Sequence, residues 1–191
     1  IDGFASHPNP ASTYEEAVQR VEAYQAAEPA QDLNPICRSE LMTHGKKVER
    51  VIIFVHGFTN CSYQFHDLGQ QFYDLGYNVL LLTLPHHGLA DKMTTDQSNL
   101  TAEELVAYTD NALDIARGLG DHTTMAGLSG GGVTTAWAAQ HRDDLDQAVI
   151  IAPSFGFRVI PTELTAAVGN LYAILPEAYD WWNPLLLENN P

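Results

Sequence analysis

Four short hydrophobic runs mark the middle of the chain. The first is VIIFV, from Val51 to Val55, and others follow over 78–83 (NVLLLT), 123–126 (TTMA) and 148–152 (AVIIA). VIIFV has no polar position, which is typical of a strand buried on both faces of a sheet. The four runs predict the strands of a mostly parallel sheet.

Segments with helical spacing alternate with these runs, over 62–75, 101–119 and 131–141. The second opens with Thr101 followed by two glutamates, a helix start signal, and it ends among glycines. Strands that alternate with helices predict an α/β fold, with a mostly parallel sheet and helices on both faces.

The pattern also suggests where the parts of the chain begin and end. Residues 1–45 are polar and rich in Pro and Ala, with one helix predicted after Ser12 and Thr13. We expect an N-terminal extension over 1–45 and a core over 46–153. The alternation of predicted strands and helices ends there. Residues 154–191 are therefore predicted to be an incomplete cap or lid segment, with a helix from Pro161 to about Leu175.

Composition narrows the class of protein and its partners. The chain has 191 residues, of which 45% are hydrophobic, and it has no apolar run near 18 residues, so we expect a soluble globular domain without a membrane span. The formal net charge is −15, which repels nucleic acid and anionic lipid. We expect no nucleic-acid partner, and the composition does not address the oligomeric state.

Two cysteines and the first residues bear on the compartment. Cys37 and Cys61 lack the spacing of a zinc site. They lie on either side of the first strand, so a disulfide between them is possible, and two free, partly buried thiols are the default. The chain begins without an export signal, which favours a cytoplasmic location, and a secreted one stays open if the N-terminus was processed.

A glycine-rich turn carries the strongest chemical signal. Gly127, Leu128, Ser129, Gly130 and Gly131 form a GxSxG motif between a predicted strand and a predicted helix. In that context the turn holds the serine in a strained conformation above the carboxyl edge of the sheet. The motif predicts an acyl-transfer nucleophile, and the alternative is a serine that merely caps the helix.

A second motif follows the first strand. After His56 and Gly57, the backbone N–H of Phe58 is placed to face a reacting carbonyl, and Gly130 offers the other N–H of an oxyanion hole. We expect the site to be lined by His56, Gly57, Leu128, His86 and His87. The histidines are expected to brace loops, with catalysis by His86 or His87 as a minor alternative, and no metal site is predicted.

The segments VIIFVHGFT, LLLTLPHHG and MAGLSGGG, in this order, resemble the α/β-hydrolase superfamily over about residues 50–155. Within it they most resemble bacterial carboxylesterases and monoacylglycerol lipases of the serine-hydrolase branch. The resemblance implies that Ser129 is the nucleophile and that Phe58 and Gly130 form the oxyanion hole. It also implies a small-molecule ester or acyl substrate and no cofactor or metal.

The sequence shows no suitable acid and histidine to complete a catalytic triad with Ser129. In this fold the order along the chain is Ser, then an acid, then His. His141 is the one histidine after Ser129, but twelve residues of helix separate them by roughly 18 Å. Asp143, Asp144 and Asp146 fall at the other end of the sheet. We therefore expect an N-terminal portion of a longer protein, whose further strands carry the acid and the histidine.

The predicted function is a serine ester hydrolase that works through an acyl-enzyme on Ser129. Alternatives on the same fold are a thioesterase, an amidase, a peptidase or a hydrolase of carbon–carbon bonds. A protein of another class, which only binds its ligand, is also possible. The aromatic residues of 154–191 either line an acyl pocket or pack the cap.

Overall fold

The computed structural model describes residues 4–155 and residue 164. The chain divides into two units, Ile1–Pro153 and Ser154–Pro191. Apart from residue 164, the helix predicted from Pro161 to about Leu175 lies outside the described residues, as do the aromatic residues of the predicted cap other than Phe155.

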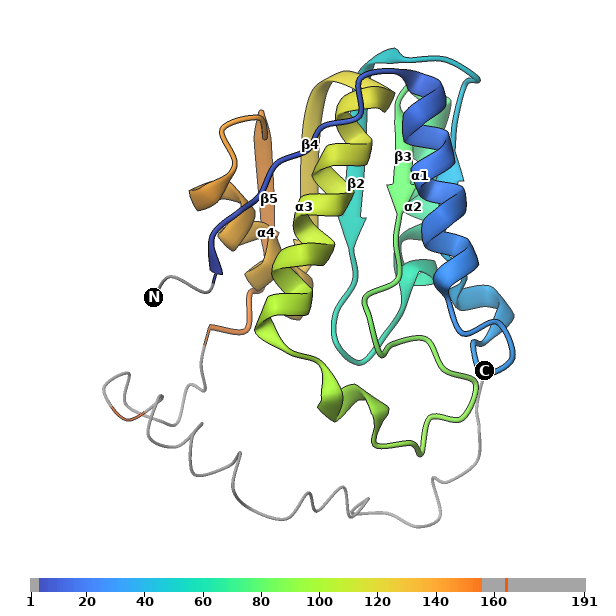
Figure 1. Cartoon of the computed structure of the whole chain (residues 1–191), viewed down its shortest axis with the longest axis vertical. Helices are drawn as coiled ribbons and strands as arrows, with labels where there is room; N and C mark the ends of the chain where they lie inside the picture. Colours follow the sequence, from blue (N-terminus) through green and yellow to red (C-terminus); the bar gives the residue numbers. More distant parts are fainter. Residues whose placement is uncertain (1–3, 156–163, 165–191) are drawn as a thin grey trace. The chain divides into compact units, whose positions relative to one another are not determined.

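A five-stranded sheet in the order β1-β3-β2-β4-β5 forms the centre of this unit (Figure 1). The strands are β1 (Glu40–Met42), β2 (Val48–Val55), β3 (Asn78–Leu81), β4 (Gly120–Leu128) and β5 (Gln147–Ile151). β2, β3, β4 and β5 pair in parallel and coincide with the four predicted runs, which confirms the mostly parallel α/β sheet. β1 was not predicted. It has only three residues and pairs antiparallel with β3.

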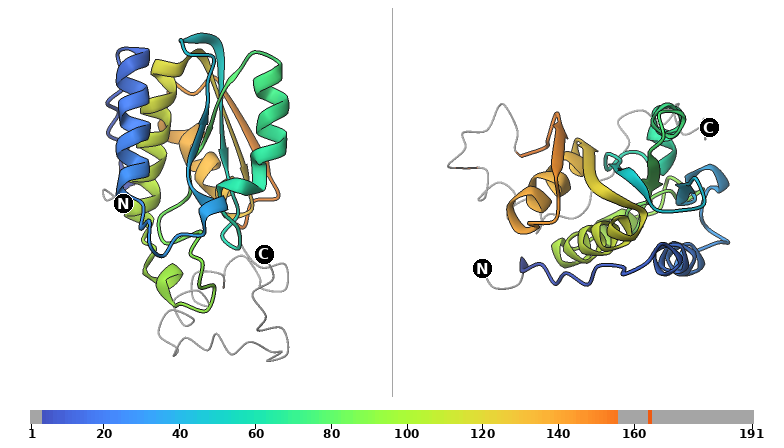
Figure 2. Two further views of the ribbon diagram at one scale, coloured as in Figure 1. Left: turned by 90° about the vertical axis from the view of Figure 1, so that its right-hand side faces the viewer. Right: turned by 90° about the horizontal axis from the view of Figure 1, so that it is seen from above.

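Helices cover both faces of the sheet. α1 (Tyr14–Ala27), α3 (Ala102–Leu119) and α4 (Gly130–His141) lie on one face, and α2 (His66–Asp74) lies on the other (Figure 2). The 3-10 turns are η2 (Pro35–Cys37), η3 (Ser62–Phe65) and η4 (Asp96–Asn99). The segment predicted as a helix from Ser62 therefore begins as a 3-10 turn and becomes α-helical at His66.

Local side-chain chemistry explains where two of these helices start. The side chain of Thr13 accepts a hydrogen bond from the N–H of Glu16 at the start of α1. Thr101 and Glu104 form a reciprocal capping box at the start of α3. Such caps satisfy backbone N–H groups that have no partner within the helix, so they fix the first turn.

The core lies on both sides of β2. Val51, Ile53 and Val55 face α3 and belong to the larger hydrophobic cluster. Ile52 and Phe54 point to the opposite face and belong to the cluster on the α2 side. Successive side chains of a strand alternate between faces. Each face of β2 is covered, which explains why VIIFV has no polar position.

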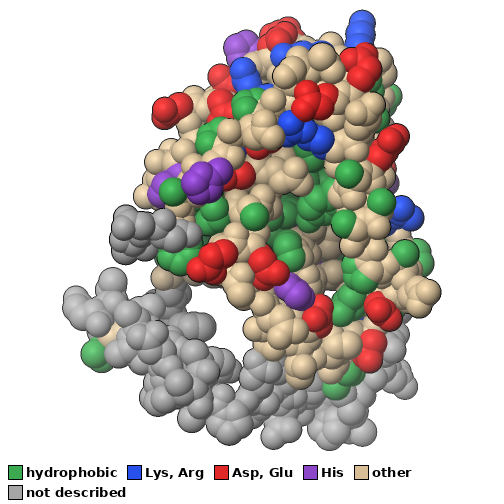
Figure 3. All heavy atoms as spheres, viewed as in Figure 1, with side chains coloured by type: hydrophobic (Ala, Val, Ile, Leu, Met, Phe, Trp, Pro, Cys, Tyr) green, Lys and Arg blue, Asp and Glu red, His purple; other side chains and the backbone are tan. Residues whose placement is uncertain are grey.

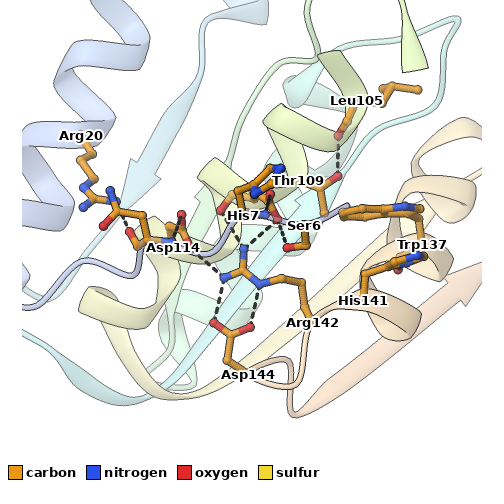
Figure 4. Close-up of polar contacts among 12 residues, drawn as sticks. Ser6, His7, Arg20, Leu105, Thr109, Asp114, Trp137, His141, Arg142 and Asp144 are labelled. Atoms are coloured by element: carbon orange, nitrogen blue, oxygen red, sulfur yellow. Dashed lines mark hydrogen bonds and ion pairs between the residues drawn. The ribbon is translucent and has the colours of Figure 1, made fainter. Parts of the chain in front are cut away.

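A buried ion-pair network joins α3 to the residue that follows α4 (Figure 4). The side chain of Arg142 is fully buried, and its guanidinium lies 2.9 Å from Asp110, 2.7 Å from Asp114 and 2.8 Å from Asp144. A buried charge is tolerated when it is paired and hydrogen-bonded. Here one guanidinium binds three carboxylates and ties the second half of α3 to the chain that follows α4.

The same aspartates hold the N-terminal segment across α3. Asp110 accepts hydrogen bonds from the hydroxyl of Ser6 at 2.5 Å and the N–H of His7 at 2.6 Å. Asp114 accepts one from the N–H of Asn9 at 2.9 Å. Residues 6–9 are therefore fixed to the layer of helices (Figure 4).

The surface reflects the excess of acidic residues. Acidic side chains are scattered over the face seen in Figure 3, among patches of hydrophobic ones. The edge strand β5 exposes Val149, Ile150 and Ile151, each by more than a third of its surface. Within the part of the chain that the structure describes, no helix is both long and apolar enough to cross a membrane.

Candidate active site

The loops that follow β2, β3 and β4 meet at the carboxyl edge of the sheet (Figure 1). Val55, the last residue of β2, is the register partner of Gly127 in β4. The residues that follow them, His56 and Gly57 on one strand and Leu128 and Ser129 on the other, therefore lie side by side. Leu128 is half-buried at the end of β4.

Ser129 lies in a strained turn between β4 and α4. Its φ is 57° and its ψ is −113°, in a region that L-residues rarely adopt. The turn is held on both sides, since the Ser129 N–H donates to the carbonyl of Ile151 at 3.0 Å and its carbonyl accepts from Val133 at 3.2 Å. The side chain of Ser129 makes no capping hydrogen bond with α4, so it does not act as an ordinary helix cap.

The glycines of the motif allow this turn to pack. A β-carbon at Gly127 would clash with the carbonyl of Gly131, and one at Gly131 would lie 2.6 Å from the carbonyl oxygen of His56. A β-carbon at Gly130 would lie 2.5–2.7 Å from the ring of Phe58. Backbone atoms close Gly127 and Gly131 to a side chain, so the GxSxG spacing follows from steric contact at this edge, whereas the obstacle at Gly130 is the ring of Phe58.

Gly57, in the loop after β2, lies close to the serine. The ideal β-carbon position at Gly57 lies 3.5 Å from the β-carbon of Ser129. The N–H of Gly57 donates to the side chain of Gln64 at 2.9 Å. The backbone of this loop therefore passes against the serine with a fixed direction.

His56 is buried beneath this loop as a neutral ring. Its Nε2 accepts a hydrogen bond from the N–H of Leu84 at 2.9 Å, so its proton is on Nδ1, which donates to the carbonyl of Gly57 at 2.8 Å. Burial lowers the pKa of His56 to about 3, despite the hydrogen bond to Gly57. Both nitrogens are occupied, which suits a residue that braces two loops and does not suit a general base.

Hydrogen bonds to the Gly57 carbonyl fix the orientation of the peptide group between Gly57 and Phe58. The Gly57 carbonyl accepts hydrogen bonds from His56 Nδ1 and, at 3.0 Å, from the N–H of Asn60. In a trans peptide the N–H points opposite to the C=O, so the N–H of Phe58 is directed away from His56 and Asn60. The ring of Phe58 packs against Gly130, the residue after the serine.

His87 lies behind Phe58, with 5.6 Å between the ring centroids. Its Nδ1 donates to the carbonyl of Pro85 at 2.7 Å, so Nε2 is an acceptor, and it receives a hydrogen bond from the Gln97 side chain at 2.7 Å. Gln97 also donates to the carbonyl of Phe58. Burial lowers the pKa of His87, which keeps this ring neutral as well.

His86 points into a different environment. Its ring lies between two carboxylates, with Nδ1 3.0 Å from Asp96 and Nε2 3.2 Å from Glu104. Burial alone would lower the pKa of His86, but the hydrogen bonds to Asp96 and Glu104 outweigh it and raise the pKa. Its φ is 61°, so this ion pair holds a strained residue. The pKa values of the adjacent histidines His86 and His87 are thus shifted in opposite directions.

A disulfide between Cys37 and Cys61 joins η2 to the end of the Phe58 loop. Neither cysteine is free, so the default expectation of two free thiols is wrong. Asn60 and Cys61 directly follow the Phe58 turn, and the side chain of Asn60 accepts from the N–H of Cys61 at 2.9 Å. The disulfide is therefore a covalent anchor for the loop beside the serine.

Other predicted candidates lie away from Ser129. Asp144 binds Arg142, and Asp146 accepts a hydrogen bond from the N–H of Thr123 near the start of β4. The Nδ1 of His141, at the end of α4, is hydrogen-bonded to the carbonyl of Trp137. Across residues 4–155 and residue 164, no cluster of His, Cys, Asp or Glu is arranged to hold a metal ion.

Sequence reasoning missed Gln97, Asp96 and Glu104 as neighbours of the site. Asp96 and Gln97 belong to η4, a polar turn with no motif of its own, and Glu104 was identified only as part of a helix start. The signal that could have pointed to them is the pair His86–His87, because buried or half-buried imidazoles need hydrogen-bond partners.

Comparison with known structures agrees with this topology. The monoacylglycerol lipase of Paleococcus ferrophilus is 21% identical, with a TM-score of 0.53 over 72% of this chain and 51% of that one. An esterase of Pyrococcus furiosus is 20% identical, with a TM-score of 0.50 over 73% of this chain and 51% of that one. At such identities the likeness concerns the fold alone. The chain spans about half the length of these structures.

A family model supplies the assignment. No curated protein matches the sequence. Residues 46–187 match the Hydrolase_4 family, described as "Serine aminopeptidase, S33". This match covers the sheet from just before β2 to the end of β5, and it includes the turns that carry Gly57 and Ser129. The chain belongs to this family of α/β-hydrolases.

Proposed function

We propose that this hydrolase cleaves carboxylic esters through an acyl-enzyme on Ser129. The observation that carries the proposal is the positive φ of Ser129 at the head of α4, with the Gly57 turn packed against its β-carbon. Strain of about 1–3 kcal/mol persists only where the surrounding structure enforces it, and it clusters at active sites. This geometry is that of a nucleophile on a strand-to-helix turn.

In the proposed reaction the Ser129 hydroxyl attacks the ester carbonyl. The new Oγ–C bond puts negative charge on the carbonyl oxygen, and the N–H groups of Phe58 and Gly130 stabilise it, each by on the order of 3 kcal/mol. The first turn of α4 adds its positive dipole end. The C–O bond to the alcohol then breaks, the alcohol leaves with a proton, and water releases the acid.

The base that accepts the serine proton is proposed to lie outside the described residues. His56 and His87 are neutral, but both nitrogens of each ring are in hydrogen bonds, and His86 is held between two carboxylates. Using any of them would break contacts that hold the loops. A histidine and a carboxylate from another part of the protein are therefore required.

Neutral, apolar esters are the proposed substrate class. The pKa values of His56 and His87, in the loops after β2 and β3, are lowered, which keeps these rings neutral, and the net charge of −15 disfavours anionic substrates. The segment 154–191 is proposed to be a cap whose apolar side chains bind the acyl chain. The two proteins with a similar fold are named as a monoacylglycerol lipase, from Paleococcus ferrophilus, and an esterase, from Pyrococcus furiosus, which agrees with an ester substrate.

Peptide hydrolysis is the second candidate, because the matched family is described as a serine aminopeptidase. The same nucleophile and oxyanion hole serve esters and amides, so the distinction depends on how the leaving group is bound. Nitrophenyl esters of acetate, butyrate and laurate, compared with aminoacyl nitroanilides, separate the two candidates.

The test uses the full-length protein, a fluorophosphonate serine probe and these substrates. Ser129→Ala is expected to lose labelling and to reduce ester hydrolysis by at least about a thousand-fold. Ser12→Ala, at an exposed serine far from the carboxyl edge, is the matched control and should behave as the wild type. Labelling that survives in Ser129→Ala would overturn the assignment, and faster cleavage of nitroanilides would favour the peptidase.

A further inference from the structure

We propose that Gln97 is a positioning residue of the oxyanion hole. Its side-chain amide holds the carbonyl of Phe58 and thereby fixes the direction of the Phe58 N–H. The inference rests on the proposed function, which places that N–H against the reacting carbonyl oxygen.

The amide of Gln97 has both of its hydrogens in use. Nε2 donates one to the carbonyl of Phe58 and the other to Nε2 of His87, at 2.7 Å. His87 can accept because its own proton is on Nδ1, bound to Pro85. A flipped amide would turn an oxygen toward two acceptors, so these contacts define one orientation of the side chain.

This contact completes the restraint on Phe58. The peptide before Phe58 is held at the Gly57 carbonyl by His56 and Asn60. The peptide after Phe58 is held at its carbonyl by Gln97. With both flanking peptides fixed, the N–H between them has little freedom to turn. Such a restraint matters because Phe58 is 37% exposed on a loop.

Gln97 is itself held by its neighbours. It belongs to η4, and the preceding residue, Asp96, binds Nδ1 of His86 at 3.0 Å. The other nitrogen of His86 binds Glu104, which caps the start of α3. The turn is thus tied to the loop after β3 and to α3. Gln97 reaches the Phe58 loop from a fixed base, as precise positioning of a donor requires.

Replacing the donor without changing its size tests the inference. Gln97→Glu is isosteric but presents acceptors to the Phe58 carbonyl and to His87. Gln140→Glu is the matched control, because the Gln140 amide also donates to a backbone carbonyl, that of Ala136, near the far end of α4. We expect Gln97→Glu to lower kcat on nitrophenyl butyrate about ten- to a hundred-fold, with KM within about two-fold, since the lost restraint acts on the transition state.

A second variant separates positioning from repulsion by the new charge. Gln97→Met has a similar length and no charge, and we expect it to lower kcat in the same way. Full kcat in Gln97→Met would overturn the inference, because the effect of Gln97→Glu would then be electrostatic. Equal losses in Gln97→Glu and Gln140→Glu would also overturn it.

Failure of the inference can be told from failure of the proposed function. If Ser129→Ala abolishes hydrolysis and the Gln97 variants keep the wild-type kcat, the inference is wrong and the function stands. If the wild type hydrolyses no ester, the proposed function is wrong. The backbone amide signal of Phe58 in ¹⁵N–¹H NMR then tests whether Gln97 positions Phe58. A shift in Gln97→Met and not in Gln140→Glu supports the positioning contact, and an unmoved signal refutes it.

Discussion

The carbonyl oxygen of His56 lies 2.6 Å from the position that a β-carbon would occupy at Gly131. The first turn of α4 is thus seated directly on the backbone that ends β2. This close approach, together with those of Gly130 to Phe58 and of Gly57 to Ser129, joins the turn that carries the proposed nucleophile to the loop that carries the proposed oxyanion donor. Their relative position is therefore a property of the core.

Gly131→Ala is predicted to damage both folding and the site. Because the obstructing atoms are backbone, the turn must move, at an expected cost of about 3 kcal/mol in unfolding free energy. Fluorophosphonate labelling of Ser129 should slow by at least about ten-fold. Gly57→Ala is the contrast for stability. Its new β-carbon meets neighbours at 3.5 Å, which is an ordinary contact. The unfolding free energy measured in urea should therefore change by less than about 1 kcal/mol. Equal losses in the two variants would contradict this.

Reduction of the Cys37–Cys61 disulfide is predicted to destabilise the protein by about 3 kcal/mol. The crosslink closes a loop with a sequence separation of 24, and opening it restores chain entropy to the unfolded state. Urea unfolding with and without a phosphine reductant measures the difference. The double variant Cys37→Ser, Cys61→Ser should have the same unfolding free energy as the reduced protein, and the reductant should not change that value. A reductant effect in that variant would mean that the change does not come from this disulfide.

His56 is predicted to make stability fall in acid. Burial lowers its pKa to about 3 in the folded protein, whereas the unfolded chain takes up the proton near pH 6.5. Between these values the unfolded state binds more protons, so this contribution is complete above pH 6.5. It is lost as the pH falls toward 3, with a slope of about 1.4 kcal/mol per pH unit.

Two histidine variants isolate that slope. His56→Gln keeps an acceptor for Leu84 but does not titrate, so its unfolding free energy should depend less on pH between 6.5 and 4. His122→Gln, at an exposed histidine, should keep the wild-type dependence. The same pH dependence in His56→Gln as in the wild type would show that His56 is not buried as a neutral ring.

Arg142→Met is predicted to lower the unfolding free energy by about 3–5 kcal/mol. It leaves Asp110, Asp114 and Asp144 without the guanidinium that they share, and two of these carboxylates are almost fully buried. Arg50→Met, at an exposed arginine paired with exposed Glu49, should change stability much less than Arg142→Met does, because an ion pair in water contributes little.

Hydrogen exchange adds a local readout for the same network. Asp110 and Asp114 also bind residues 6–9, so the amides of this segment should exchange faster in Arg142→Met than in Arg50→Met. Unchanged exchange there would mean that the segment is held independently of Arg142.

Much of the fold could be predicted because its signals are local. An apolar run such as VIIFV marks a buried strand, and a capping residue such as Thr13 or Thr101 marks the start of a helix. β1 was not predicted because its three residues form a strand only through their pairing with β3, in which Glu40 is the register partner of Leu81. A pairing partner forty residues away leaves no pattern in so short a segment.

Part of the candidate site could likewise be predicted from the sequence, and part of it depends on packing. The sequence by itself determined that Gly57, Phe58 and Ser129 follow parallel strands and so reach one edge of the sheet, because the carboxyl ends of parallel strands coincide. Only the tertiary structure decided the roles of the histidines. Whether an imidazole is neutral or charged depends on burial and on partners such as Leu84 for His56 or Asp96 for His86, which packing brings together from distant segments.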